Sequence, residues 1–407
     1  MSTGPNPDPV EDWAESGIAA LTGFLDGPPL IPPGRAATRA RELSAFVAAA
    51  TSGTVRIDGA RMLSERAAFT GHRRSGAVSA GGSCRLLPTA DGWAAVSCAR
   101  PDDPLLLGAL VSAEIDDDPW PVVARWMREH TGADLVERAE LLGVAAGPVA
   151  APGTPPPVPG PPRSVEGLLV VDFSALWAGP LCAHLLGLAG ARVVKVETPW
   201  RPDGARRGNP EFYRLLHSGH ESVVLDPNLP GERDALRDLV AAADIVIEAS
   251  RPRALAGFGL DADTFVAEGG TWVSITAHGR DSGRVGFGDD VAASAGLVAH
   301  DRGTPVFVGD AIADPLTGLT AAALAMSAPD GDRGRLWDVS MSAVVGATLP
   351  DKESAVPRAH ADRGRWWVDT ASGAVPVAEP VLRAPTGTAP ESGSDTGKVL
   401  SELRIRR

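Results

Sequence analysis

Short apolar runs alternate with helix-like segments in the second half of the chain, and this alternation predicts the fold. Residues 167–174 (GLLVVDFS) and 192–197 (RVVKVE) have the length and flanking turn residues of buried strands. Between them, residues 182–190 (CAHLLGLAG) are helix-like, and Gly190 stands where a helix commonly ends. A strand, a loop, a helix and a second strand in this order predict a βαβ unit of a parallel sheet.

The same order recurs further along the chain. Strands are predicted at residues 222–226 (SVVLD), 245–250 (IVIEAS) and 272–279 (WVSITAHG), with a helix at residues 232–244 (ERDALRDLVAAAD). We therefore expect an α/β fold, in which a Rossmann-like, doubly wound parallel sheet forms a large domain. Its ligand is expected beyond the carboxyl ends of the strands.

A proline-rich stretch (APGTPPPVPGPP) separates this region from what precedes it, because prolines lack the N–H groups that a helix or central strand needs. Before it, a strand-like DGWAAVSC and two helix-like segments predict a small α+β domain. The end of the chain is rich in Pro, Gly, Ser and Thr, which predicts an extended or partly disordered tail. The predicted divisions are 1–75, a partial repeat of a later segment; 76–150, the small domain; 151–164, the linker; 165–348, the large domain; and 349–407, a tail that packs back on the large domain.

Length, charge and cysteine content exclude some classes of function. The length of 407 residues favours two or three domains, and the formal charge of -13 argues against nonspecific nucleic-acid binding, which needs a basic face. Neither a signal peptide nor a membrane-spanning run of about eighteen apolar residues is visible, so a cytoplasmic protein is expected. The three cysteines lack the spacing of a zinc site or a disulfide framework and are interpreted as buried apolar residues. An anionic cofactor can still bind where arginines gather.

One internal similarity links the two ends of the chain. Residues 15–39 echo residues 293–314, so that Gly34 matches Gly309 and Arg39 falls where Asp314 stands. If the match is real, the chain holds two descendants of one unit, and only the second keeps a carboxylate. Chance similarity between two Gly/Ala-rich helix entries is the alternative.

Five segments in order resemble the class III CoA-transferases, the family of formyl-CoA transferase, carnitine CoA-transferase and the α-methylacyl-CoA racemases. Each segment alone is a weak match, but their order within about 180 residues makes the resemblance strong. The segments are residues 165–197 (VEGLLVVDFSALWAGPLCAHLLGLAGARVVKVE), 245–252 (IVIEASRP), 272–283 (WVSITAHGRDSG), 307–325 (FVGDAIADPLTGLTAAALA) and 336–344 (LWDVSMSAV).

The resemblance covers most of the chain, but in altered order. Residues 91–98 and 135–149 resemble the family's small domain, which normally follows the large one, and residues 384–403 resemble the family's carboxyl terminus. This order suggests a circular permutation or a fusion of two halves. The family fold implies a Rossmann-like large domain, a small domain and a homodimer whose chains interlock.

The resemblance implies that Asp314 is the nucleophile. In the family an aspartate attacks the thioester carbonyl, and the released CoA thiolate then leaves an aspartyl-CoA thioester that passes CoA to an acceptor carboxylic acid. Such a carboxylate must be ionised in a partly dry cleft with N–H donors nearby. Asp314 opens a predicted helix, whose positive end would keep the carboxylate charged. The alternative is that Asp314 merely caps this helix.

Coenzyme A carries phosphates, so arginines near the strand ends are candidate contacts. We predict that Arg206, Arg207 and Arg251 contact these phosphates. The alternative is that they are solvated loop residues without a ligand. By analogy with the family, Trp177 and Ala178 border the pantetheine, although Trp177 is equally compatible with a core position. Arg201 and Arg253 lie in the same two loops.

Several departures from the family pattern keep other functions open. HSGHES at residues 217–222 lacks two positive charges usual near the nucleotide, and GFGDD at 286–290 lacks the histidine of the racemase branch. His278 is a candidate substitute base, or a structural or solvated residue. We therefore predict a CoA-transferase that uses acyl-CoA and carboxylic acid substrates without a permanent cofactor, without a metal, and without a nucleic-acid or membrane partner. An acyl-CoA racemase or isomerase, and a degenerate CoA-binding subunit, are the alternatives.

Overall fold

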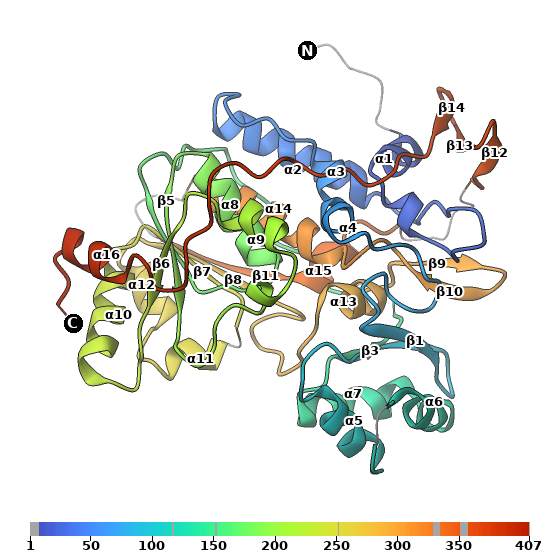
Figure 1. Cartoon of the computed structure of the whole chain (residues 1–407), viewed down its shortest axis with the longest axis horizontal. Helices are drawn as coiled ribbons and strands as arrows, with labels where there is room; N and C mark the ends of the chain where they lie inside the picture. The colour runs from blue at the N-terminus through green and yellow to red at the C-terminus, as the bar shows by residue number, and fades with distance from the viewer. Residues whose placement is uncertain are drawn as a thin grey trace.

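The computed structural model describes residues 8–115, 118–150, 153–250, 252–328, 334–350 and 357–406, and its largest feature is a six-stranded sheet. The strand order is β11-β8-β7-β4-β5-β6, and every neighbouring pair is parallel. Counted along the chain, this is the doubly wound order 3-2-1-4-5-6, so the predicted α/β fold is confirmed (Figure 1). The order reverses between β4 and β7. The strands are β4 (Leu169–Asp172), β5 (Arg192–Glu197), β6 (Glu221–Val224), β7 (Ile245–Glu248), β8 (Thr271–Thr276) and β11 (Arg335–Ser340).

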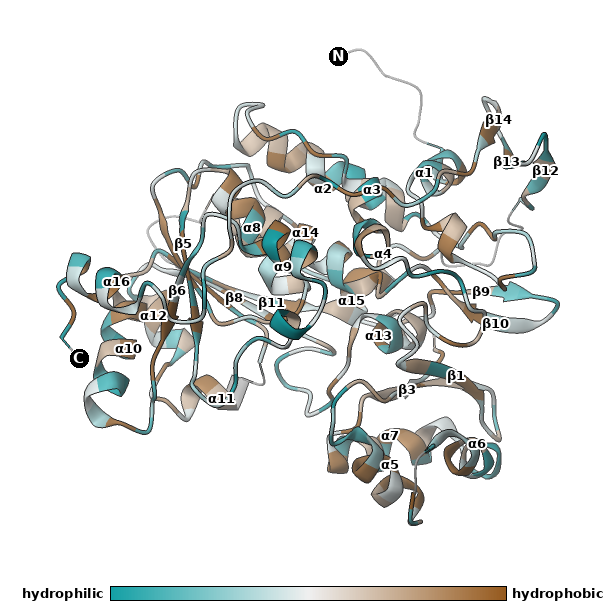
Figure 2. Ribbon diagram, in the orientation of Figure 1, coloured by the Kyte–Doolittle hydropathy of each residue, from teal (hydrophilic) through white to brown (hydrophobic). Residues whose placement is uncertain are grey.

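Alternate residues of these strands face two separate cores. Val170 and Val193 point into the core that contains α8 (Ala178–Leu188) and α14 (Ala313–Ala325). Their neighbours Val171 and Val194 point to the opposite face, which is covered by α10 (Pro230–Ala241), α12 (Ala262–Ala267) and α16 (Thr396–Glu402). Both faces are therefore buried, which explains the continuous apolar runs in the sequence and the hydrophobic colouring of the central strands in Figure 2.

The first 75 residues do not stand apart from the large domain. Trp13, Ile18 and Leu43 are at most 1% exposed and belong to the same core as α8 and α14. Gly34 and Gly309, matched in the internal similarity, both have a left-handed backbone, with φ of 77° and 71°, and each precedes a helix. The elements here are α1 (Pro9–Glu15), the 3-10 turn η1 (Ala19–Leu21), α2 (Ala36–Ala50), which packs on α14, α3 (Gly59–Met62) and α4 (Glu65–Thr70).

The predicted small α+β unit lies between these two regions and has its own core. Its strands β1 (Cys84–Pro88), β2 (Trp93–Ser97) and β3 (Ala146–Pro148) pair antiparallel. Its helices are α5 (Asp103–Val111), α6 (Trp120–Glu129) and α7 (Gly132–Leu142). The Ser97 hydroxyl donates to Asp290 at 2.7 Å and so connects this unit to α13 (Gly288–Ser294) of the large domain.

The carboxyl-terminal segment is more ordered than its composition predicts. Three short strands, β12 (His360–Asp362), β13 (Arg365–Thr370) and β14 (Gly373–Pro376), form an antiparallel sheet next to α1. The chain then runs back to the far side of the large domain, where α16 packs against β6 (Figure 1). Arg383 pairs with Glu65 of α4 at 2.8 Å on the way. The tail therefore contacts both the first helices and the main sheet.

The remaining elements connect these units. They are the 3-10 turn η2 (Gly204–Arg207), α9 (Pro210–His217), α11 (Pro252–Ala256), the hairpin β9 (Val298–Asp301) and β10 (Thr304–Phe307), and α15 (Met341–Gly346). No helix in the described ranges is both long and apolar enough to cross a bilayer.

A buried lysine holds two loops at the carboxyl end of the sheet. Lys195 of β5 is 1% exposed, and its ammonium lies 3.0 Å from the Asp203 carboxylate and 3.8 Å from that of Asp172. It also donates to the Ser174 carbonyl at 2.7 Å. The attraction of two carboxylates outweighs the cost of burial and raises the pKa of this lysine, so the ammonium stays charged. The loops that follow β4 and β5 are thus joined at one point.

Candidate functional site

Asp314 lies where two helices begin. It is the second residue of α14, and its partly buried carboxylate accepts a hydrogen bond from the N–H of Ala178, the first residue of α8. The two helices approach closely because Gly318 has no side chain: a Cβ there would lie 2.7 Å from the Ala178 carbonyl oxygen. The N-cap of α14 is Ile312, and Asp314 makes no capping bond to its own helix. The capping interpretation of Asp314 is therefore wrong.

Further carboxylates surround Asp314 and change its acidity. Burial, together with repulsion from Asp289 and Asp310, raises the pKa of Asp314 to about 7, against attraction to Arg66 and the bond from Ala178. Burial therefore opposes the positive helix end, which was expected to keep this carboxylate charged. Asp289 is buried as well, and burial with the charge of Asp310 raises its pKa to about 6.

Arg66 comes from α4, near the amino terminus, and provides positive charge at this site. Its Nε and Nη2 donate to the two carboxylate oxygens of Asp310 at 2.9 and 2.5 Å, although the two residues are 244 positions apart. His72 Nδ1 lies 3.2 Å from the same carboxylate. Burial opposes ionisation of Asp310, but the Arg66 charge and these bonds hold its pKa well below the usual range. The guanidinium also lies over the Trp177 ring, 5.1 Å from its centroid.

Glycine allows the backbone to approach Asp314. A Cβ on Gly288 would lie 2.2 Å from Asp314 Oδ2 and 2.5 Å from the Ala311 carbonyl oxygen. Any larger residue at position 288 would therefore displace the carboxylate or the loop before α14.

Two non-glycine residues with a left-handed backbone flank the site. Ala311 has φ of 48° and Leu176 has φ of 70°, a conformation that costs about 1–3 kcal/mol and persists only where neighbours enforce it. The Ala311 N–H donates to Asp289 at 2.8 Å, and the Leu176 N–H donates to Asp203 at 3.0 Å. Buried carboxylates therefore hold both strained turns. Leu176 is also 44% exposed.

The predicted contacts with coenzyme A differ in their burial and in the partners that they already have. Trp177 is 2% exposed and packs edge-on against Phe212 at 5.3 Å, so it is a core residue that also contacts Arg66. The donors of Arg206 are engaged, by the Glu197 carboxylate at 2.6 Å, the Pro390 carbonyl and the Ser222 hydroxyl.

Two further arginines follow β5 along the chain: Arg201, and Arg207 at the end of η2. Arg207 is exposed and makes no hydrogen bond or ion pair within the described part of the chain. Arg251 lies outside the described residues, and Arg201 is exposed. Arg207 is therefore the predicted phosphate contact with free donors.

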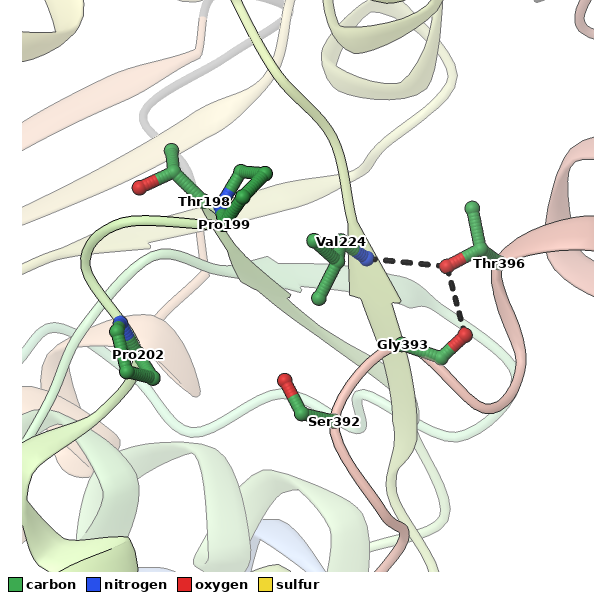
Figure 3. A pocket seen from close by; sticks show the side chains of 7 residues that line it. All are labelled: Thr198, Pro199, Pro202, Val224, Ser392, Gly393 and Thr396. Atoms are coloured by element: carbon green, nitrogen blue, oxygen red, sulfur yellow. Dashed lines mark hydrogen bonds between the residues drawn. The ribbon is translucent and has the colours of Figure 1, made fainter.

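A cavity lies at the ends of β5 and β6. Its volume is about 440 Å³, and its walls come from the loop after β5, from β6 and from the tail. In Figure 3 the Thr396 hydroxyl accepts from the Val224 N–H at 3.0 Å and donates to the Gly393 carbonyl at 2.9 Å, which holds the tail wall in place. The lining residues, all uncharged, are Thr198, Pro199, Pro202, Val224, Ser392, Gly393 and Thr396.

Sequence reasoning missed most of the residues around Asp314. Asp310 lies inside a segment that resembles the family, and Asp289 lies in the GFGDD loop at residues 286–290, but nothing in their local pattern marks them as neighbours. Arg66 and His72 carry no local signal, because only the packing of α4 on the large domain brings them to the site. His278 is partly buried, and burial lowers its pKa to about 4. No group of metal-ligating side chains occurs in the residues with described structure.

Comparisons with known proteins relate part of the chain to CoA-transferases. Residues 165–354 match the sequence profile of CoA-transferase family III. Human succinyl-CoA:glutarate CoA-transferase is 29% identical over 39% of this chain and 40% of its own length. Succinyl-CoA--D-citramalate CoA-transferase of Chloroflexus aurantiacus is 31% identical over 40% of this chain and 44% of its own.

The chain spans about half the length, or less, of the curated relatives that it matches. Among solved structures, a CAIB/BAIF family protein from Brucella suis aligns with a TM-score of 0.44 and 26% identity, over 53% of this chain and 65% of that chain. The fold assignment therefore rests on the parallel sheet itself. The sequence match relates residues 165–354, somewhat less than half of the chain, to CoA-transferase family III.

Proposed function

We propose that the protein transfers coenzyme A from an acyl-CoA thioester to a carboxylic acid, with Asp314 as the nucleophile. One observation carries the proposal: a partly buried carboxylate at the start of α14 accepts an N–H from α8 and has a cation nearby. Such a carboxylate is poorly hydrated and therefore more reactive than one in water. The test is to trap a covalent CoA or acyl adduct on Asp314 after incubation with acyl-CoAs.

The reaction follows from the charge changes at Asp314. The carboxylate attacks the thioester carbonyl, which forms an acyl-aspartyl anhydride and releases the CoA thiolate. The thiolate attacks the aspartyl carbonyl, which forms an aspartyl-CoA thioester and releases the donor carboxylate. An acceptor carboxylate then reverses both steps, and Asp314 is regenerated. Each step needs a rigid carboxylate, and Gly288 and the Ala178 N–H limit where the Asp314 oxygens can lie.

Coenzyme A is proposed to bind along the carboxyl ends of β4, β5 and β6. The uncharged cavity beside Thr198 and Val224 has room for part of the nucleotide, and Arg207 is free to contact a phosphate. The exposed Leu176 and the backbone at Ala178 would border the pantetheine on its way to Asp314. Arg206 and Arg251 remain predicted contacts; a phosphate on Arg206 would replace part of its pairing with Glu197.

The rate of adduct formation is expected to depend on pH through Asp314. Its pKa of about 7 means that the reactive carboxylate is the minor form at pH 6 and the major form at pH 8. The rate should therefore rise about tenfold between these pH values. Asp289→Asn removes one negative charge that repels the Asp314 carboxylate. It should therefore move the midpoint of the pH–rate profile to lower pH. Rapid-quench mass spectrometry measures both profiles, and identical midpoints in the two proteins would contradict this explanation.

Removing Arg207 is expected to weaken CoA binding without affecting chemistry. A contact between an exposed arginine and a phosphate contributes only modestly to the free energy of binding. Arg207→Ala should therefore raise KM for acyl-CoA roughly five- to tenfold and leave kcat unchanged. The effect should shrink at high salt, because screening weakens the contact in the unmodified protein. Arg237→Ala, which removes an exposed arginine paired with Asp234 on α10, is the matched control. Equal KM values for the two variants would exclude Arg207 as a phosphate contact.

One observation also favours the racemase alternative. His72, hydrogen-bonded to Asp310, places an acid–base group in the site that the loop at residues 286–290 does not supply. A racemase would exchange the α-proton of an acyl-CoA with deuterium from solvent in the absence of any acceptor acid. Exchange that disappears in His72→Asn, without any covalent adduct, would favour this second function.

The cytoplasmic location and the homodimer remain proposals that rest on the family resemblance. A catalytically degenerate CoA-binding subunit is the outcome in which CoA binds but neither an adduct nor exchange is observed. Sedimentation of the purified chain with and without CoA addresses the dimer directly.

A further inference from the structure

Arg66 is held in one orientation by two neighbours. Its Nε and Nη2 are bonded to Asp310, and the guanidinium plane lies over Trp177. Asp310 is fully buried, so this pairing is well shielded from water. A side chain with four rotatable bonds is thereby fixed before any ligand arrives.

One edge of the Arg66 guanidinium remains free. Nη1 has no hydrogen-bond partner among the residues that the structure describes, and the side chain is 26% exposed. Arg66 also attracts the Asp314 carboxylate, and the Trp177 ring under its guanidinium belongs to the residue before Ala178. The site of the proposed nucleophile therefore contains a preorganised cation with an unused N–H donor.

The charge of the site changes during the proposed reaction. Three carboxylates face Arg66: Asp310 directly, and Asp289 and Asp314 at longer range. When Asp314 becomes a thioester, it loses its negative charge and no longer attracts the guanidinium. The site is then least repulsive to another anion, at the stage when the acceptor acid must enter. The donor carboxylate is released at the same stage and has the same chemistry.

We propose that the free edge of Arg66 binds the carboxylate of the acceptor acid, assisted by His72, and positions it for attack on the aspartyl-CoA thioester. This inference rests on the proposed function and adds the acceptor subsite to it. Arg66 contacts Asp310 with one edge and the substrate with the other. The attacking oxygen forms the new anhydride bond with the Asp314 carbonyl carbon, and the CoA thiolate leaves.

The test uses the full chain with acetate, succinate and glutarate as acceptors. Arg66→Met should raise KM for the acceptor acid at least tenfold, while KM for acyl-CoA stays within about twofold. Arg66→Lys keeps the positive charge but not the planar, forked set of donors of the guanidinium. A KM between those of the unmodified protein and Arg66→Met is therefore expected. Arg61→Met removes an exposed arginine of the neighbouring α3 and is the matched control.

Loss of Arg66 also leaves Asp310 buried without its cation, which destabilises the fold. The double variant Arg66→Met with Asp310→Asn removes that unpaired charge; it should fold and still show the raised acceptor KM. Phenylglyoxal labelling of Arg66 in the unmodified protein should slow when succinate is added to the CoA-loaded enzyme.

Two outcomes separate this inference from the proposed function. If the unmodified protein forms the Asp314 adduct but the folded double variant keeps a normal acceptor KM, the acceptor subsite is excluded and the transferase stands. If the unmodified protein forms no adduct with any acyl-CoA, the transferase itself is excluded, and the acceptor subsite with it.

Discussion

Replacing Asp314 by asparagine is expected to lower the rate of CoA transfer by at least about 10³-fold, because the amide cannot form the covalent intermediate. The Ala178 N–H still finds an oxygen acceptor, and the shape of the side chain is unchanged. The fold should therefore survive. Intact-protein mass spectrometry after incubation with acyl-CoAs, with hydroxylamine to trap the intermediate, should show an adduct on the unmodified chain and none on the variant.

The control for this experiment is an aspartate with a purely structural place at a helix start. Asp261 caps α12 by accepting the Thr264 N–H at 2.7 Å and is not a predicted contact with coenzyme A. Asp261→Asn should therefore form the adduct at a normal rate. An adduct that persists in Asp314→Asn would move the covalent chemistry to another residue.

Replacing Lys195 by methionine is expected to cost about 3–5 kcal/mol of the free energy of unfolding, the usual effect of removing one partner from a buried ion pair. Asp172 and Asp203, both almost fully buried, would be left without their cation. The loss should be largest at neutral pH. Burial raises the pKa of Asp172, so the loss should shrink as the pH falls below that pKa, because protonation removes unpaired charge. Urea unfolding at pH 5 and pH 7.5 measures both quantities.

An exposed lysine provides the comparison. Lys398 pairs with Glu221 at 2.9 Å, but its side chain is 59% exposed. Water solvates both partners whether or not they meet, so Lys398→Met should leave the unfolding midpoint unchanged within error. A similar loss in both variants would mean that the Lys195 pair is not desolvated as its burial suggests.

The large domain could be predicted from sequence because its strands are buried on both faces. Runs such as LVVD at β4 and IVIE at β7 are continuous and apolar, and the helices between them have clear periodicity. The small sheet of β12, β13 and β14 could not be predicted, because its residues are mostly exposed and carry no apolar pattern. Its backbone pairing depends on the nearby α1.

The residues of the candidate site also differ in how far the sequence could predict them. Asp314 was predicted as the nucleophile because it lies in a segment that resembles the family, and this role stays a prediction; its raised pKa was not foreseen. A pKa depends on neighbours in space, and Asp314 is repelled by Asp289 of α13 and by Asp310 of the loop before α14. Arg66 was missed because its partner Asp310 is distant in sequence. Arg206 was predicted as a phosphate contact, and its pairing with Glu197 of β5 was not foreseen.

Arg66 and Asp310 are separated by 244 residues in the sequence, and this separation affects how the chain folds during its synthesis. At about 5–20 residues per second, roughly 12–50 s separate the emergence of the two residues from the ribosome. During that time the first helices present Trp13, Ile18 and Leu43 without the surface of α14 that later covers them. We expect the nascent chain to rely on chaperones in this interval, and fast translation of the middle of the gene to improve the yield of folded protein.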